Sequence, residues 1–254
     1  MTKIHDTAIV SSKCNLGSNV IIGPYSVIHA NTSIGDDCVI GSHCVIHPYV
    51  QIGKNNEFTE HVVIGGLPQD LKFEKKCKSY VVIEENNTFR EFCTVHRGSI
   101  DKSQTRIASN CLLMCYSHVG HDSVVDNSVV LTNSATLGGF VSIGEFAVIG
   151  GNTYIHQYTR IGAYAMVSGH TAVTKDVVPF TLLGRDPVKH YKLNSVGIKR
   201  ADIEGVNYEL LQKAFRYLRD GRDIADLDST KELEYLKAWI NAESKRGIYG
   251  FLKL

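Results

Sequence analysis

The chain has 254 residues, of which 43% are hydrophobic and 21% are charged, and this composition is ordinary for a folded globular protein. Its 27 lysines and arginines nearly balance 26 aspartates and glutamates, so the net charge of +1 argues against a general nucleic-acid binder. No segment resembles a signal peptide or stays apolar long enough to span a bilayer, and we therefore expect a cytoplasmic protein. The seven cysteines are odd in number, which argues against a disulfide framework, and they lack zinc-finger spacing.

An aliphatic or aromatic residue recurs every six positions along most of the chain. The repeat runs from Val10 to Ile64, from Ile83 to Val95, and from Ile107 to Val173. A period of six fits neither an α-helix nor a set of hairpins, but it fits a parallel β-helix in which three hexapeptides form one triangular coil. The repeating residue then points into the prism and stacks on its counterpart about 4.8 Å away in the next coil.

The residue two positions before each repeating residue points inward as well, because side chains alternate along a strand. We expect small side chains there, and five of the seven cysteines take this position. They are Cys14, Cys38, Cys44, Cys93 and Cys111. We interpret them as small core residues rather than reactive thiols.

Two polar segments interrupt the repeat, at residues 65–82 and 97–105. Loops that leave a regular solenoid often carry its function. After Val173 the repeat ends, and apolar residues take helical spacing over residues 208–219 and 231–240.

The repeat and the helical pattern divide the chain in two. We predict an all-β parallel β-helix domain over residues 1–186 and a C-terminal domain of about three helices over residues 187–254.

Five motifs carry a resemblance to a known family. They are LPQDLKF at 67–73, TVHRGS at 94–99, SHVGHD at 117–122, IHQY at 155–158 and LNSVGIKR at 193–200. In their order, and together with the repeat and the trailing helices, they resemble the UDP-N-acetylglucosamine O-acyltransferases of lipid A biosynthesis. The resemblance implies a left-handed β-helix, whose hand a period of six does not fix.

The same resemblance implies an activity. It is the transfer of a 3-hydroxyacyl chain from acyl carrier protein to the 3-position of UDP-N-acetylglucosamine, the first step of lipid A biosynthesis, without a cofactor. It also implies a homotrimer whose active sites lie between subunits.

Histidines are the main candidates for the chemistry. His121 and His156 follow repeat positions that are two whole coils apart, so both project from the same edge of the prism. The residues alone leave His118 and His121 open as metal ligands, acid–base groups or solvated side chains. The resemblance assigns His121 as the general base, with Asp122 as its partner and the N–H of Gly139 as the oxyanion donor.

Substrate contacts are also implied by the resemblance, position by position. Those to the glucosamine ring are Gln69, Asp70, Lys72 and His118, and those to the nucleotide are His156, Gln157, Asn194 and Arg200. Gly169 leaves room for a long acyl chain. His96 matches a family position as either a substrate contact or a structural residue, and His29, His43 and His47 are expected on solvated faces.

The acyl donor implied by the resemblance, acyl carrier protein, is acidic. Basic residues near the predicted helices offer it a landing patch, or else form a solvated helix face. They are Lys199, Arg200, Arg216, Arg219 and Arg222.

Two residues depart from the family pattern. Phe140 stands where the family usually has a histidine, and Val196 where some members have a glutamate. Both positions concern substrate recognition, so N-acylation of a 3-amino analogue, or of another surface-glycan sugar nucleotide, remains an alternative. An alternative from another class is a catalytically silent or carbonic-anhydrase-like β-helix, but His118, His121 and His156 lack that class's spacing, and we expect no metal.

Overall fold

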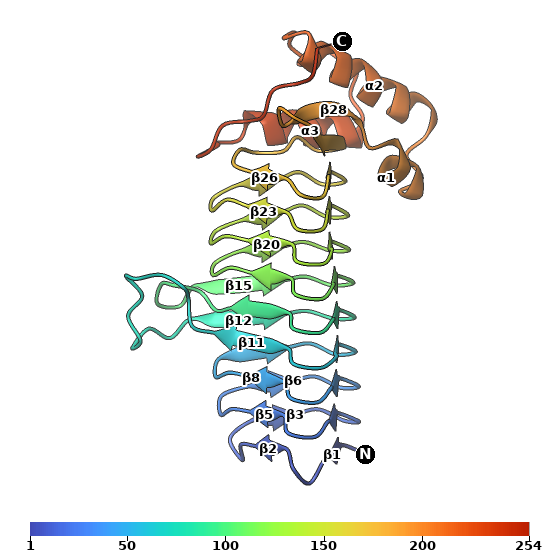
Figure 1. Ribbon diagram of the computed structural model, residues 1–254. Helices are drawn as coiled ribbons and strands as arrows, with labels where there is room; N and C mark the ends of the chain where they lie inside the picture. The colour runs from blue at the N-terminus through green and yellow to red at the C-terminus, as the bar shows by residue number, and fades with distance from the viewer. Residues whose placement is uncertain (254) are drawn as a thin grey trace.

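The computed structural model describes residues 1–253, which form a tall triangular prism of stacked coils with helices at one end (Figure 1). Three sheets make the faces of the prism, and each coil up to residue 161 contributes one short strand to each sheet. The predicted parallel β-helix is therefore confirmed.

The eleven-stranded sheet contains β1 (Lys3–Ile4), β4 (Ile21–Ile22), β7 (Val39–Ile40), β10 (Glu57–Phe58), β13 (Thr88–Phe89), β16 (Leu112–Leu113), β19 (Val130–Leu131), β22 (Val148–Ile149), β25 (Met166–Val167), β27 (Thr181–Gly184) and β28 (Lys189–Leu193). The nine-stranded sheet contains β2 (Ile9–Val10), β5 (Val27–Ile28), β8 (Val45–Ile46), β11 (Val63–Gly66), β14 (Thr94–His96), β17 (His118–Val119), β20 (Thr136–Leu137), β23 (Tyr154–Ile155) and β26 (Ala172–Val173). The eight-stranded sheet contains β3 (Asn15–Leu16), β6 (Ser33–Ile34), β9 (Val50–Ile52), β12 (Tyr80–Ile83), β15 (Gln104–Ile107), β18 (Val124–Val125), β21 (Ser142–Ile143) and β24 (Arg160–Ile161).

The repeating residues form the core of the prism. From Ile22 to Val173 they are buried and stack in register, as the rings of Phe58 and Phe89 do at 4.6 Å. Val10 and Leu16 are only partly buried, because no coil covers them on the N-terminal side. This inward stack is the main hydrophobic stabilisation of the fold.

The inward position before each repeating residue is less uniform than we expected. Four of the five cysteines predicted there are buried, whereas Cys14 in the first coil is half-buried. Burial raises the pKa of the Cys93 and Cys111 thiols to about 11, so both are poor nucleophiles at neutral pH. Larger side chains also fit at this position, including Val20 and the hydrogen-bonded Asn56.

The two interruptions of the repeat are shorter than predicted. β11 runs to Gly66 and β12 begins at Tyr80, so the first loop covers residues 67–79. The second loop covers residues 97–103, because β15 already begins at Gln104. Pairing with the coils on either side extends these strands into segments whose sequence breaks the repeat. Both loops project from one side of the prism (Figure 1).

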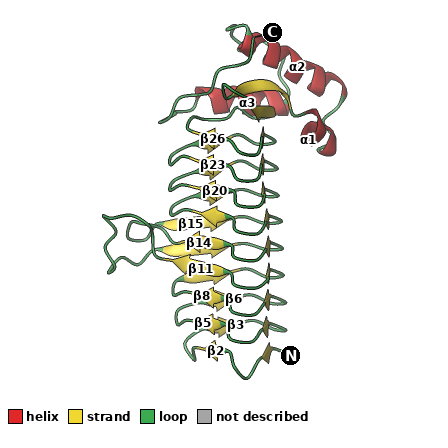
Figure 2. Cartoon of the chain, viewed as in Figure 1, coloured by secondary structure: helices red, strands yellow, loops and turns green. Residues whose placement is uncertain are grey.

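The C-terminal helices cap the last coil, and all of them lie at this end of the molecule (Figure 2). They are α1 (Ser195–Arg200), α2 (Gly205–Arg219) and α3 (Lys231–Asn241), and the last two confirm the helical spacing noted above. The antiparallel pairing of β28 with β27 was not predicted. Residues 186 and 187 lie in the turn between these two strands, and the division into two domains stays a prediction.

A buried ion pair attaches this end to the prism. Nε of Arg160 on β24 lies 2.6 Å from Oδ2 of Asp176, whose side chain is fully buried. The Arg160 guanidinium also lies 4.4 Å from the ring of Trp239 on α3, so this side chain of the prism contacts the C-terminal helices as well. Within residues 1–253, no helix has the length and apolar character needed to cross a membrane.

Candidate active site

The nine-stranded and eight-stranded sheets meet at one edge of the prism, which we call the histidine edge. Each loop leaves the prism here, because the first connects β11 to β12 and the second connects β14 to β15. His121 lies at the same edge, between β17 and β18. The structure therefore brings most of the predicted site residues to one edge. They are Gln69, Asp70, Lys72, His121, Asp122, Gly139, His156 and Gln157.

His121 and Asp122 form a hydrogen-bonded pair. Nδ1 of His121 lies 2.8 Å from Oδ2 of Asp122. An ionised carboxylate only accepts hydrogen bonds, so Nδ1 carries a proton, and in the neutral imidazole Nε2 then has the free lone pair. The two side chains are only 13% and 6% exposed, so a solvated histidine does not describe His121. The pair has the geometry of an oriented general base.

The second loop surrounds the Asp122 carboxylate with donors. Both the N–H and the hydroxyl of Ser99 donate to Oδ2, at 2.9 and 2.6 Å, and the Ser103 hydroxyl donates to Oδ1 at 2.5 Å. Burial alone would raise the pKa of the Asp122 carboxyl, but hydrogen bonds from His121, Ser103 and Ser99 outweigh it and hold that pKa below its ordinary value. Asp122 is therefore ionised at neutral pH.

Gly139 lies directly beside the His121 ring. A Cβ added at this position would lie 2.5 Å from Cε1 and 2.6 Å from Nε2 of His121, so only glycine fits unless the ring moves. Among residues 1–253, the N–H of Gly139 has no acceptor. An unpaired donor near Nε2 suits an oxyanion that forms beside the base.

Two further histidines lie next to the pair. Nδ1 of His118, on β17, lies 2.8 Å from the hydroxyl of Thr94, and its ring meets His96 edge-on at 4.7 Å. Burial, with smaller effects of His96 and His121, lowers the pKa of His118 to about 4, and burial also lowers the pKa of His96. Both rings are therefore neutral at pH 7. No described residue hydrogen-bonds to the ring of His96, which leaves its nitrogens free for a substrate.

The first loop carries the predicted sugar-binding residues. Gln69 and Lys72 are exposed, and Asp70 accepts the N–H of Lys72 through Oδ1 at 2.9 Å. Arg97 holds this loop: its guanidinium lies 5.5 Å from the ring of Phe73, and Nη2 donates to the carbonyl of Cys77 at 3.3 Å. The loop is thus fixed on the side of the prism that carries the base.

Phe140, one of the two departures from the family, contacts the His121 ring directly. Its ring meets His121 edge-on, with centroids 5.3 Å apart, and stacks on Tyr158 at 4.8 Å. The ammonium of Lys245, from the segment after α3, lies 4.6 Å from the Tyr158 ring. The imidazole therefore has an apolar wall where the family usually has a histidine.

The predicted nucleotide contacts fall into two groups. His156 and Gln157 are exposed at the histidine edge, whereas Asn194 and Arg200 line a groove of about 520 Å³ on the outer face of the eleven-stranded sheet. Val196, the other departure, lines the same groove. Asn194 also caps α1, since its Oδ1 accepts the N–H of Gly197. Its Nδ2 donates to the backbone carbonyl of Tyr164.

Gly169 lies at a different edge again, between β25 of the eleven-stranded sheet and β26 of the nine-stranded sheet. Within one chain, the groove and Gly169 are therefore separated from His121 by the width of a sheet.

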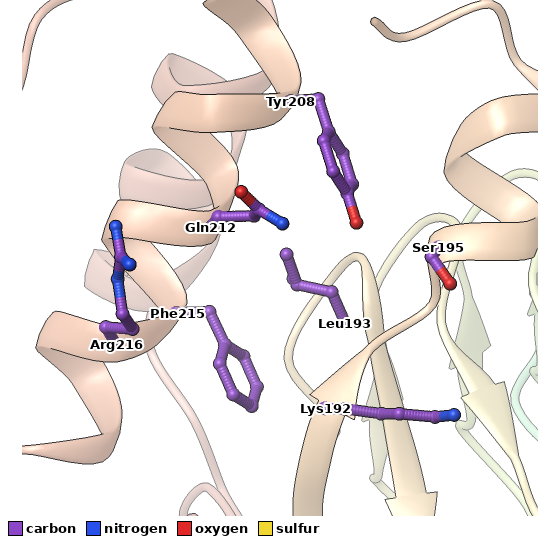
Figure 3. Close-up of a pocket in the computed structure, with 7 residues that line it drawn as sticks. All are labelled: Lys192, Leu193, Ser195, Tyr208, Gln212, Phe215 and Arg216. Atoms are coloured by element: carbon purple, nitrogen blue, oxygen red, sulfur yellow. The ribbon is translucent and has the colours of Figure 1, made fainter.

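A second hollow lies among the C-terminal elements (Figure 3). It has a volume of about 320 Å³ and is lined by Lys192, Leu193, Ser195, Tyr208, Gln212, Phe215 and Arg216. Arg216 belongs to the predicted basic patch. Two other members of the patch have partners on the protein, because Arg219 pairs with Asp220 at 3.0 Å and Arg222 lies over the ring of Tyr217.

The histidines of the N-terminal coils are not all on solvated faces. His29 and His47 stack at 5.4 Å, and burial, with smaller effects of His29 and Arg97, lowers the pKa of His47. His43 is exposed but stacks on His61 at 4.9 Å. Among the described residues, no three His, Cys, Asp or Glu side chains converge as metal ligands would.

Several functional candidates were missing from the sequence-based prediction. Ser99, Ser103 and Thr94 hold the predicted histidine and aspartate groups, and Arg97 holds the first loop. Three of the four lie in the motif TVHRGS. The residue types alone did not predict these roles, because serine and arginine are common in loops. The path of an irregular loop also does not follow the repeat, so the repeat did not predict which groups its side chains contact.

Comparison with known proteins supports the resemblance. The model of the bacterial transferase hexapeptide (six repeats) matches residues 31–66, and that of domain 2 of the UDP-N-acetylglucosamine O-acyltransferases matches residues 176–249. The chain is 52% identical to the acyl-(acyl-carrier-protein)–UDP-N-acetylglucosamine O-acyltransferase of Sulfurihydrogenibium sp., over 98% of this chain and 94% of the relative. The enzyme of the same name from Campylobacter lari is 37% identical, over 98% and 97% of the two chains.

Solved structures agree over the whole fold. A UDP-N-acetylglucosamine acyltransferase from Bacteroides fragilis superposes with a TM-score of 0.91 at 32% identity, covering 96% of this chain and 99% of that one. The one from Campylobacter jejuni superposes with a TM-score of 0.89 at 32% identity, covering 98% of this chain and all of that one. The expected left-handed β-helix is thereby confirmed. With relatives this similar along nearly its full length, the chain belongs to the family of UDP-N-acetylglucosamine O-acyltransferases.

Proposed function

We propose that this protein transfers a 3-hydroxyacyl chain from the thioester of acyl carrier protein to the 3-hydroxyl of UDP-N-acetylglucosamine, the first step of lipid A biosynthesis. The relatives named above carry both the acyl carrier protein and the sugar nucleotide in their names. The observation that carries the proposal is the His121–Asp122 pair, whose ring lies against Gly139, a residue with an unpaired N–H.

Acyl transfer from a thioester to an alcohol needs a base and an oxyanion donor. Nε2 of His121 removes the hydroxyl proton as the sugar oxygen attacks the thioester carbonyl carbon. The Gly139 N–H donates to the oxyanion that forms, while ionised Asp122 stabilises the imidazolium. When the carbon–sulfur bond breaks, the proton passes from His121 to the departing thiolate. The products are an ester and the free thiol of acyl carrier protein.

The acceptor binds at the same histidine edge. Gln69, Asp70 and Lys72 of the first loop reach the glucosamine ring, with His118 as a neutral group that both donates and accepts hydrogen bonds. Arg200 suits the diphosphate, because its guanidinium offers forked donors. Asn194, His156 and Gln157 complete the nucleotide contacts, and Gly169 leaves space for the acyl chain.

The separation of these residues within one chain supports a homotrimer. The base lies at the histidine edge, whereas the groove with Asn194 and Arg200 lies on the eleven-stranded sheet. Two chains packed side by side bring the groove of one against the histidine edge of the next. A cyclic arrangement of three prisms then gives three equivalent sites between subunits.

The acyl donor is a second partner. Lys199 and Arg200 in the last turn of α1, with Lys192 and Arg216 around the hollow of Figure 3, offer positive charge to an acidic acyl carrier protein. We place the protein and the proposed reaction in the cytoplasm.

Phe140 and Val196 favour a second candidate acceptor, a 3-amino analogue acylated on nitrogen. The test supplies the protein with 3-hydroxyacyl-acyl carrier protein and either UDP-N-acetylglucosamine or its 3-amino analogue, and measures kcat/KM for each. A higher value for UDP-N-acetylglucosamine, with an ester product, supports the proposal. A higher value for the amine supports the second candidate, and no acyl transfer to either acceptor refutes both.

A further inference from the structure

The second loop is built so that two hydroxyls meet one carboxylate. Ser99 and Ser103 approach Asp122 from opposite ends of the loop. The Ser99 hydroxyl donates to Oδ2, the oxygen that also accepts from His121, and the Ser103 hydroxyl donates to Oδ1. Gly98 permits this turn, since a Cβ there would lie 2.3 Å from the Ser103 hydroxyl oxygen. The Ser103 hydroxyl also accepts the N–H of Ile100 at 3.1 Å, which directs its hydrogen toward Asp122.

These donors fix the orientation of the carboxylate. Oδ2 receives His121 and both donors of Ser99, and Oδ1 receives Ser103. With both oxygens engaged, the carboxylate does not rotate about its Cβ–Cγ bond. Its direction sets the direction of the imidazole, because Nδ1–H of His121 donates to it.

We infer that Ser99 and Ser103 are positioning residues for acyl transfer: they hold Asp122 so that His121 keeps its proton on Nδ1 and presents Nε2 to the acceptor hydroxyl. The inference rests on the proposed role of His121 as the general base. The second loop then takes part in catalysis by orienting His121 rather than by contacting the substrate.

A purely structural role would be to tie the second loop to the prism. Backbone hydrogen bonds already do this without either hydroxyl: the N–H of Tyr80 donates to the carbonyl of Ser103, and that of Lys102 donates to the carbonyl of Lys78. The N–H of Lys78 also donates to the carboxylate of Asp101. Removing the two hydroxyls therefore leaves the loop attached, and the effect on the base is separable from an effect on folding.

The test compares Ser99→Ala, Ser103→Ala and the double variant with Ser99→Thr and Ser103→Thr, which keep the hydroxyl. Ser109→Ala is the matched control, because the Ser109 hydroxyl donates to the carboxylate of Glu84 on another edge of the prism. We expect the double alanine variant to lose about 10- to 100-fold in kcat, as partners behind a catalytic histidine typically do. The acceptor KM and the thermal midpoint should match those of the control.

A second readout does not depend on activity. In the wild-type protein, imidazole ¹⁵N shifts of His121 should show a single tautomer with the proton on Nδ1, and in the double variant they should show a mixture. If the double variant kept kcat within about twofold of Ser109→Ala, or lost only acceptor affinity, the positioning role would be wrong. A wild-type protein with the Nδ1 tautomer but no acyl transfer would instead refute the proposed function. If the double variant does not fold, Ser99→Ala alone is judged by the same criteria.

Discussion

At the scale of single residues, one imidazole carries the proposed chemistry, and three neighbours determine how it lies. Asp122 holds Nδ1, Gly139 leaves space beside the ring, and Phe140 meets it edge-on. Any change that moves the ring changes the distance from Nε2 to the acceptor hydroxyl. Rates of proton transfer are sensitive to such shifts, because a general base acts only within hydrogen-bond reach.

Gly139→Ala tests this geometry without removing a functional group. The new methyl would meet the His121 ring, which then has to turn away, whereas the backbone N–H remains. We expect kcat to fall by about 10²-fold, the typical effect of a misplacement of about 1 Å. Steady-state kinetics measure the loss, with Gly250→Ala, whose methyl meets open space, as the control. Equal turnover of both variants would show that the ring position does not matter.

The candidate base was predictable from the sequence, but its supports were not. His121 and Asp122 stand in a motif whose place in the repeat fixes the edge from which they project. Ser99 and Ser103 come 19 to 23 residues earlier, across a non-repeating loop. No periodicity predicts which carboxylate such hydroxyls will reach, so only the folded loop reveals the contact.

At the scale of elements, the repeat predicted the coils between Val10 and Val173, because each strand there pairs with neighbours of the same pattern, but β1 and β27 lie outside the repeat. The ends of the strands beside the loops were less predictable, since pairing extends β12 and β15 beyond the repeat. β28 was missed for a related reason. Its sequence, KHYKL, has no distinctive strand pattern, and it becomes a strand by pairing with β27.

His190, on β28, gives this junction a dependence on pH. It is fully buried, its Nε2 accepts the N–H of Val178 at 2.9 Å, and burial lowers its pKa to about 4. A histidine in the unfolded chain has a pKa of about 6.5, so above this pH His190 is neutral in both the folded and the unfolded state. As the pH falls from about 6.5 to 4, the unfolded chain gains a proton that the folded one does not. The free energy of unfolding therefore falls, by roughly 3 kcal/mol for this residue at pH 4.

His190→Gln keeps an acceptor for Val178 but does not titrate. We expect its stability to fall less steeply than that of the wild-type protein between pH 6.5 and 4. Chemical denaturation across this range measures the difference, and the exposed His5→Gln is the control. Identical pH dependence in the wild-type protein and His190→Gln would mean that buried His190 does not destabilise the fold in acid.

At the scale of the whole molecule, a left-handed prism presents different functional groups on different faces. The histidine edge carries the proposed base, His121, and the eleven-stranded sheet carries the groove with Arg200. The resemblance implied sites between subunits, but the motifs alone did not show which of these residues share an edge and which lie apart within one chain. The proposed site between subunits would explain why one chain holds both sets without bringing them together.

Mixed assemblies of inactive variants test the shared site. His121→Ala and Arg200→Ala each damage a different contributor, so a mixed trimer contains one interface with His121 from one chain and Arg200 from its neighbour. Co-expression should restore acyl transfer at low acceptor concentration. As a control, His121→Ala with Asp122→Ala should restore none, because both residues come from the same chain. Restoration in the control pair, or none in the first pair, would refute sites shared between subunits.

The most direct test of the account is the turnover of His121→Ala beside that of His118→Ala, with saturating acyl donor. A general base typically contributes 10² to 10⁴ in rate, so His121→Ala should lose about that factor in kcat while keeping its assembly and most of its nucleotide affinity. His118→Ala should mainly raise the acceptor KM, because a contact made equally in the ground and transition states leaves kcat unchanged. Near-wild-type turnover of His121→Ala would contradict the assignment of the base and the mechanism built on it.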